Sequence, residues 1–145
     1  MILDSQLEFS SAQAVTASAA STNLVDLGIA RDIGVGEDLW IRIGVTTAMT
    51  DSGSDSTITV TLQTDDNASF SSAATVATLV VIPATTAAGV EYYIKLPAAV
   101  LAEYERYIRG YYTAANGNLT TGSFDMNIVK DIQHYTDFAS GFSID

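Results

Sequence analysis

Residues 57–64, with the sequence TITVTLQT, alternate strictly between aliphatic and polar side chains. Successive side chains of a β-strand point to opposite faces, so Ile58, Val60 and Leu62 fall on one face and the threonines with Gln63 on the other. Threonine is β-branched and suits a pleated, half-exposed surface. The segment therefore predicts an antiparallel strand with one face in a core and the other towards solvent.

The same period of two recurs in residues 39–46, 90–96 and 124–129. Each of these segments has an aliphatic or aromatic face that alternates with more polar positions, which is typical of a strand on the surface of a sandwich. The expected core faces are Leu39, Ile41, Ile43 and Val45, then Val90, Tyr92, Ile94 and Leu96, and then Phe124, Met126 and Ile128.

Four other segments complete the set of expected strands. Residues 6–16 and 22–28 look like an N-terminal pair, 75–83 form a more continuous apolar run that ends at Pro83, and 107–113 are rich in strand formers. Stretches rich in Gly, Asn, Asp and Ser lie between the strands and favour turns. We therefore predict an all-β, eight-stranded antiparallel sandwich of the jelly-roll type. Composition leaves an immunoglobulin-like sandwich open, although that fold usually has seven strands and a cysteine signature.

One segment departs from the strand pattern. Pro97 is followed by AAVLAEYERY, in which alanines favour a helix and proline suits its first turn. We expect at most a short helical turn near residues 98–102, which gives way to a strand by about Tyr107.

The size of the chain predicts a single domain. A chain of 145 residues can bury one sizeable core. The jelly roll is expected to occupy residues 1–131, and residues 132–145 to form a tail or an extra segment packed on the same domain. The N-terminus lacks the cations of a secretory signal, and no segment approaches the roughly 20 apolar residues of a membrane span. We expect a soluble protein without a membrane partner.

The charge balance argues against nucleic acid as a partner. The chain has 17 acidic and 6 basic residues, with a net charge of −11, and a phosphate backbone is repelled unless the cations gather in one stripe. They are instead scattered: Arg31, Arg42, Lys95, Arg106, Arg109 and Lys130.

Residues suited to catalysis or metal binding are sparse. There is no cysteine, and the single histidine, His134, is not accompanied by a nucleophile motif. Asp65, Asp66 and Asn67 stand side by side in a turn-like segment and offer oxygens to calcium, but the glycine and glutamate of an EF-hand loop are missing. We expect a solvated turn there, and no catalytic residue, metal or cofactor in the protein.

The tyrosine-rich segment YERYIRGYYT predicts an interaction surface. As a strand, it places Ile108, Gly110 and Tyr112 towards the core and the residues between them outwards. Tyrosine and arginine are enriched in interface cores, and a second strand also points an aromatic residue and an arginine outwards. The alternative is that these arginines lie along neighbouring rings or pair with local acids such as Glu105. The expected protein-interface residues are Trp40, Arg42, Tyr107, Arg109 and Tyr111.

Four blocks of the sequence, in order, carry a resemblance to a known family: MILDSQLEFSSAQAVTASAASTNLVDLG, ARDIGVGEDLWIRIGVTT, VTLQTDDNASFSSAATV and YIRGYYTAANGNLTTGSFDMNIV. To about Asp131, the chain resembles the small jelly-roll capsid cement proteins of tailed bacteriophages. The resemblance implies a non-enzymatic protein, made in the host cytoplasm, that decorates the exterior of the virion. Its implied partners are the major capsid protein and a second copy of itself, in a homodimer.

Two other classes of function stay open from the sequence. A non-catalytic jelly-roll module of a phage tail or attachment protein would bind carbohydrate or a host receptor, with Trp40, Tyr107 and Tyr111 stacking on sugar rings. A hydrolase or metal-dependent enzyme would use His134 with the loop aspartates.

Overall fold

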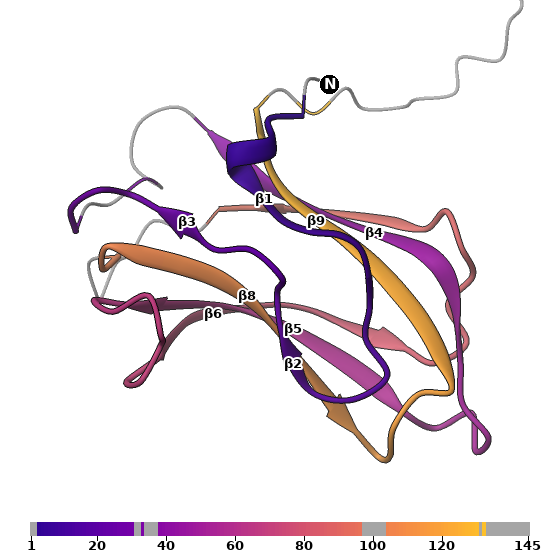
Figure 1. Ribbon diagram of the computed structural model, residues 1–145. Helices are drawn as coiled ribbons and strands as arrows, with labels where there is room; N and C mark the ends of the chain where they lie inside the picture. The colour runs from indigo at the N-terminus through magenta and orange to yellow at the C-terminus, as the bar shows by residue number, and fades with distance from the viewer. Residues whose placement is uncertain (1–2, 31–32, 34–37, 97–103, 131, 133–145) are drawn as a thin grey trace, which may run out of the picture.

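Two antiparallel sheets pack face to face in the computed structural model of the chain (Figure 1). The structure describes residues 3–30, 33, 38–96, 104–130 and 132. In this part of the chain a short 3-10 helix, η1 (Ser5–Leu7), precedes nine strands. The strands are β1 (Glu8–Ala14), β2 (Ala19–Ala20), β3 (Val25–Asp26), β4 (Leu39–Thr50), β5 (Thr57–Asp65), β6 (Ala74–Pro83), β7 (Glu91–Lys95), β8 (Tyr107–Ala115) and β9 (Thr121–Lys130).

The strand order is that of a jelly roll. The first sheet has the order β1-β9-β4-β7, and the second has β2-β8-β5-β6, with β3 also paired to β8. The pairs β1–β9, β4–β7 and β5–β6 are nested within one another around the β5–β6 turn, and β2 and β3 pair with β8 between them. Nested antiparallel pairs of this kind arise when one long antiparallel ribbon is rolled into two sheets, which is the jelly-roll arrangement. The expected all-β sandwich is confirmed.

The strand count differs from the expected eight because one strand position is divided. β2 pairs with β8 through Ala20 and Tyr111, and β3 pairs with the same strand through Val25 and Ile108. Taken together, β2 and β3 fill one edge position. The two expected N-terminal strands form, but they lie in different sheets, β1 beside β9 and β3 beside β8. The helical turn expected near 98–102 lies outside the described residues.

The core lies between the sheets and uses the faces that the period of two predicts. Ile41, Ile43 and Phe124 of the first sheet and Ile58 and Leu62 of the second are all fully buried. Each such side chain contributes roughly 1.5–3 kcal/mol by leaving water. The rings of Tyr112 on β8 and Phe124 on β9 stack across the sheets with centroids 5.4 Å apart.

The outer face of β9 is more buried than its alternation predicts. Asn127 and Val129 point away from the core, yet they are only 2% and 1% exposed. β9 is a central strand between β1 and β4, and η1 packs against it. Figure 1 shows η1 beside β1 and β9 at one end of the sheet. Helix η1 and the side chains of neighbouring strands therefore account for a burial that alternation alone does not predict.

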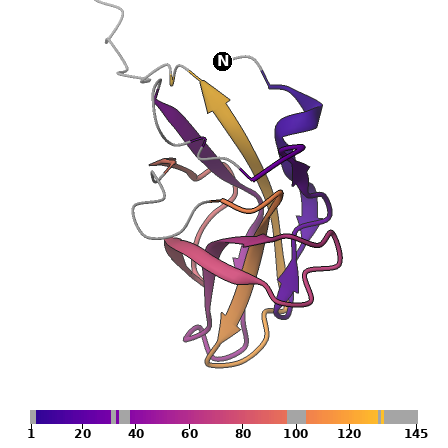
Figure 2. The same cartoon turned by 90° about the vertical axis from the view of Figure 1, so that its left-hand side faces the viewer.

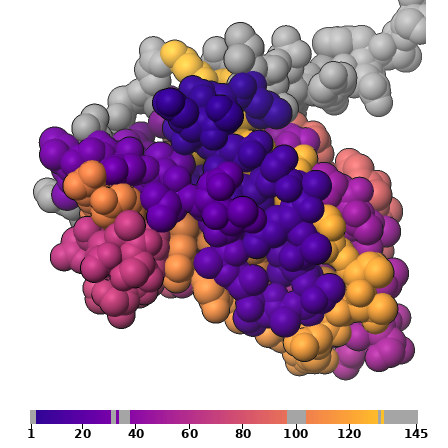
Figure 3. Space-filling model, viewed as in Figure 1, coloured from indigo at the N-terminus to yellow at the C-terminus, as the bar shows by residue number. Residues whose placement is uncertain are grey.

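The N-terminal residues close one side of the sandwich. Figure 3 shows this segment, in indigo and purple, spread over the side from which β1 passes to β2 and β3. The hydroxyl of buried Tyr112 donates to Ser10 Oγ at 2.8 Å, and Ser10 Oγ donates to Gln13 Oε1 at 2.7 Å. The first of these bonds joins the second sheet to β1 of the first sheet, and the second lies within β1. Burial raises the pKa of Tyr112 to about 12 against the opposing effect of Ser10.

The β4–β5 and β8–β9 turns lie close together at the end of the molecule opposite η1 (Figure 2). The backbone N–H of Thr120 donates to Thr50 O at 2.7 Å, and the side chain of Asn116 donates to Asp55 O at 3.2 Å. These bonds link the β4–β5 and β8–β9 turns, so the end is closed by backbone and amide groups. Among the described residues, no helix has the length and apolar character needed to cross a membrane.

Candidate functional site

The outward-facing side chains of β5, β6 and β8 form a broad surface on the second sheet. The register places Gln63 opposite Arg109 and Thr61 opposite Tyr111, and it continues across β5 to Thr75 and Thr78. We name this surface the threonine–tyrosine face, and define it by Thr57, Thr59, Thr61, Gln63, Thr75, Thr78, Val81, Tyr107, Arg109, Tyr111 and Thr113. All these residues are half-buried or exposed.

The threonine–tyrosine face carries one charged residue within its named set, and that residue is the cation Arg109. At the Tyr107 end of the face, Asp26 binds Arg106 at 2.8 Å, and Asp65 is fully buried. For a chain with a net charge of −11, this is a surface from which acidic side chains are largely withheld. The alternation of β5 and of β8 predicted which of their side chains point outwards. Only the pairing of the two strands shows that these side chains form one surface.

Arg109 is held by contacts from three directions. Its Nε atom donates to Gln63 Oε1 at 2.9 Å, directly across the β8–β5 ladder. Its guanidinium lies over the ring of Phe70, 4.1 Å from the centroid, and also 5.4 Å from the centroid of Tyr111. A guanidinium stacked on rings keeps its charge while burying its flat faces. The arginine is therefore pre-positioned on the face.

Phe70 comes from the β5–β6 turn and has a left-handed backbone, with φ of 52°. Such a φ is uncommon for a bulky residue and is maintained by surrounding bonds. The Asp65 carboxylate accepts the backbone N–H groups of Asn67 and Ser72, each at 2.8 Å, and Phe70 N donates to Asn67 O at 2.9 Å. Burial acts to raise the pKa of Asp65, but these backbone bonds, together with side-chain bonds from Asp66 and Ser72, outweigh it and lower the pKa below its ordinary value.

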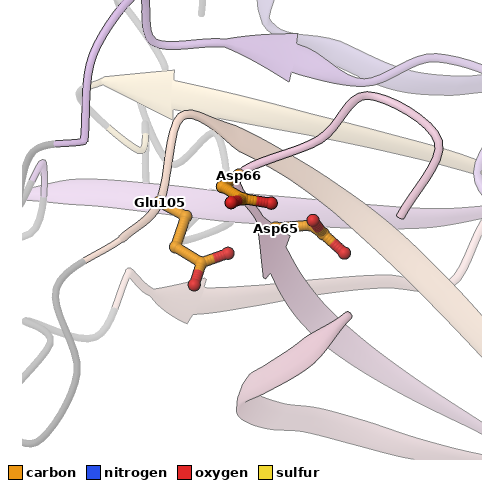
Figure 4. Close-up of side chains that lie close together, drawn as sticks. All are labelled: Asp65, Asp66 and Glu105. Atoms are coloured by element: carbon orange, nitrogen blue, oxygen red, sulfur yellow. The ribbon is translucent and has the colours of Figure 1, made fainter. Parts of the chain in front are cut away.

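Asp65 and Asp66 at the start of this turn form a group of three carboxylates with Glu105, which precedes β8 (Figure 4). Oxygen atoms of Asp65, Asp66 and Glu105 lie within 4.8 Å of one another. Glu105 reaches the turn because its N–H donates to Thr64 Oγ1 at 2.8 Å. The sequence drew attention to Asp65, Asp66 and Asn67, but it missed Glu105, which only strand pairing brings near.

The three carboxylates could supply part of a calcium coordination shell, which needs six to eight oxygens. Asp65 already accepts bonds from the turn, and Asn67 Oδ1 accepts the N–H of Ser69 at 2.9 Å. Residues 66–69 are exposed, as the expectation of a solvated turn requires, but Asp65 is fully buried and departs from it. Asp65 in addition acts as the hub of the turn.

Arg42 on the first sheet is engaged inside the chain. It forms an ion pair with Glu91, and its Nη1 atom lies 3.7 Å from Asp125 Oδ2. The hydroxyl of Tyr93 donates to the other oxygen of Glu91 at 2.6 Å. This hydroxyl lowers the pKa of Glu91, burial opposes the shift, and Arg42 reinforces it. The guanidinium passes over Gly44, where an added Cβ would lie 3.1 Å from Arg42 Nη2.

The five residues expected at an interface fall on two opposite faces. Trp40 and Arg42 lie on the outside of the first sheet, and Tyr107, Arg109 and Tyr111 lie on the outside of the second. They therefore form two separate surfaces. Both arginines make the local contacts that the sequence left open as an alternative to an interface. Arg42 pairs with nearby acids, and Arg109 lies along neighbouring rings. His134 lies outside the described residues.

A family comparison covers nearly all of this sandwich. The Bbp16 family model matches residues 9–128, from the second residue of β1 to within β9. The chain belongs to the Bbp16 family. The part shared with Bbp16 includes the whole threonine–tyrosine face and the turn with Phe70, and it lies within the domain expected at residues 1–131. A comparison with curated proteins gives no match.

Proposed function

We propose that this Bbp16 family member is a structural cement, or decoration, protein of a tailed bacteriophage. In this proposal it binds the exterior of the icosahedral capsid after synthesis in the host cytoplasm. It stabilises the contacts between subunits of the major capsid protein and performs no catalysis. The resemblance to jelly-roll cement proteins and the observed jelly-roll order support this role.

The observation that carries the proposal is the threonine–tyrosine face. A stable protein contact needs roughly 800 Å² from each partner, and its centre is usually depleted of charge and enriched in tyrosine and arginine. The face has this composition, whereas the rest of the chain holds nearly all its charge. In an acidic protein, withholding acids from one side favours docking through that side.

A homodimer would strengthen binding to a shell without a tight individual contact. Two linked copies engage neighbouring subunits, and the second contact then forms within an already bound complex. The major capsid protein and a second copy of this chain are therefore the proposed partners. Nucleic acid, a membrane and a cofactor have no part in the mechanism.

Binding to purified shells tests the proposal with a matched pair of variants. Thr78 and Thr46 are both exposed threonines on strands, but Thr78 belongs to the threonine–tyrosine face and Thr46 lies on β4 of the other sheet. Thr78→Glu should weaken cosedimentation with expanded capsids by about tenfold or more, because the new carboxylate would be desolvated in the contact. Thr46→Glu should bind like the wild type.

Heat resistance of the shells provides the second measurement. The wild-type protein should raise the temperature at which purified capsids break open, and Thr78→Glu should restore only part of that gain. A wild-type protein that neither sediments with capsids nor protects them would rule out the cement function. Equal binding by both variants would instead move the contact away from this face.

The carbohydrate-binding alternative loses its expected platform. Tyr107 and Tyr111 lie on the second sheet, and Trp40 lies on the first. One sugar chain therefore cannot stack on all three rings from a single side of the sandwich. A glycan array that detects strong binding by a protein without affinity for capsids would favour this alternative.

A further inference from the structure

Among the described residues, Arg109 differs from three other cations in having no acidic partner. In a protein with 17 acidic residues, a cation within reach of a carboxylate is the common outcome. Arg109 makes no ion pair within the part of the chain that the structure describes, where its recorded contacts are Gln63, Phe70 and Tyr111. Three other cations each hold at least one acid: Arg42 holds Glu91 and Asp125, Arg106 holds Asp26, and Lys95 holds Asp38.

The contacts of Arg109 fix its guanidinium, and among the described residues they leave one edge of it without a hydrogen bond. Gln63 accepts from Nε, and the rings of Phe70 and Tyr111 lie beside the guanidinium. The Nη1 and Nη2 atoms donate no hydrogen bond to the residues that the structure describes. An arginine held this way loses little further rotamer freedom when it binds a ligand, which favours affinity.

The surroundings restrict the kind of anion that Arg109 can accept. Asp65 is paired with Tyr107, two residues along β8 from Arg109, and Asp66 and Glu105 lie beside it. A polyanion such as nucleic acid would be repelled by this acidic group. A single carboxylate carries much less charge than a polyanion, so it meets the Nη edge of the guanidinium with less repulsion.

Building on the proposed function, we propose that Arg109 receives an aspartate or glutamate side chain of the capsid subunit. Its Nη1 and Nη2 atoms donate to the two carboxylate oxygens in the side-by-side geometry that the guanidinium fork favours. Phe70, Gln63 and Tyr111 position the fork. A second copy of this chain is the other source of a carboxylate, and the crosslinking experiment below distinguishes the two sources.

Zero-length crosslinking tests this contact directly. A carbodiimide joins a carboxylate to an amine only when the two are in contact, and Arg109→Lys supplies the amine. After the variant is shown to bind shells, peptide mass spectrometry should detect an amide bond between position 109 and an aspartate or glutamate of the capsid protein. Arg106→Lys is the matched control, since its bonded partner Asp26 lies in the same chain, and it should give the internal link instead.

The affinity of Arg109→Gln provides a second readout. Loss of a charge-assisted pair of hydrogen bonds should weaken shell binding by about tenfold or more, whereas Arg106→Gln should change it by less than about twofold. Equal binding by Arg109→Gln and the wild type would overturn the inference while leaving the cement function standing. A link from position 109 to a second copy of this chain, or no link in a bound variant, would overturn it as well.

A measurement without capsids separates this inference from the proposed function. Sodium acetate, titrated against sodium chloride at equal ionic strength, should move the NMR signal of the Arg109 Nε–H group along a saturable curve. The Arg106 Nε–H signal should hardly move, because Asp26 already occupies that guanidinium. If the wild type fails to bind shells but shows this acetate response, the cement function fails and Arg109 remains a carboxylate receptor. No response to acetate would overturn the receptor itself.

Discussion

At the scale of single residues, glycine at position 110 determines how closely the sheets approach. A Cβ added there would lie 2.5 Å from Met126 Sδ on β9 and 3.2 Å from Met126 Cε. Gly110 belongs to β8 of the second sheet and Met126 to β9 of the first, and both are buried. The alternation of residues 107–113 correctly placed Gly110 in the core, but the sulfur atom that it faces follows from sheet packing.

Substitution of Gly110 by alanine should destabilise the protein. We expect Gly110→Ala to lower the free energy of unfolding by roughly 1–3 kcal/mol, the usual cost of overpacking a core, as measured by urea denaturation. Gly44→Ala is the matched control, because Gly44 is also a buried strand glycine but its Cβ would meet the Arg42 side chain on the outer side of the first sheet, at 3.1 Å, and not a core residue. A Gly110→Ala protein that is as stable as Gly44→Ala would show that Met126 moves aside at little cost.

At the scale of elements, the β5–β6 turn connects a structural carboxylate to the candidate interface. Asp65 closes the turn through Asn67 and Ser72, and the turn then carries Phe70 to the guanidinium of Arg109. The sequence indicated a turn rich in acids at this position. It gave no indication that the aromatic residue within the turn would meet an arginine on β8, because that contact depends on the β5–β8 register.

Removal of the Asp65 charge should loosen this turn. In Asp65→Asn, an amide group replaces one acceptor oxygen and faces a backbone N–H, so one of the two bonds is lost. Hydrogen exchange at the amides of Asn67 and Ser72 should become faster, and the NMR signal of the Arg109 Nε–H group should shift. Asp66→Asn, at the exposed neighbour, should leave both unchanged. Unchanged exchange in Asp65→Asn would mean that the turn is held by its other bonds.

At the scale of the whole molecule, one buried hydroxyl links the two sheets. Tyr112 on β8 donates to Ser10 on β1, and burial raises the pKa of Tyr112 to about 12. An unfolded tyrosine ionises near 10, so between about pH 10 and 12 the unfolded chain releases this proton while the folded chain retains it. The stability that the protonated group provides is therefore full below about pH 10 and is lost as the pH rises towards 12.

Alkaline unfolding measures this linkage. The free energy of unfolding should fall by about 3 kcal/mol between pH 10 and 12 on account of Tyr112, since each pKa unit corresponds to about 1.4 kcal/mol. Tyr112→Phe should remove that part of the slope and, at pH 7, cost about 1 kcal/mol for the lost hydrogen bond. An identical slope in Tyr112→Phe would assign the alkaline loss of stability to other groups.

The sequence by itself determined which residues face the core and which face outwards, because side-chain alternation is a local property of an extended chain. It therefore predicted the sandwich, the buried faces of β4, β5, β8 and β9, and the outward position of Tyr107, Arg109 and Tyr111. Tertiary structure decided which outward faces share a side of the molecule. It separated Trp40 and Arg42 from the three β8 residues and surrounded Arg42 with acids, and it gave Arg109 no acidic partner among the described residues. Strand order and register decide this because they are set by contacts between distant segments.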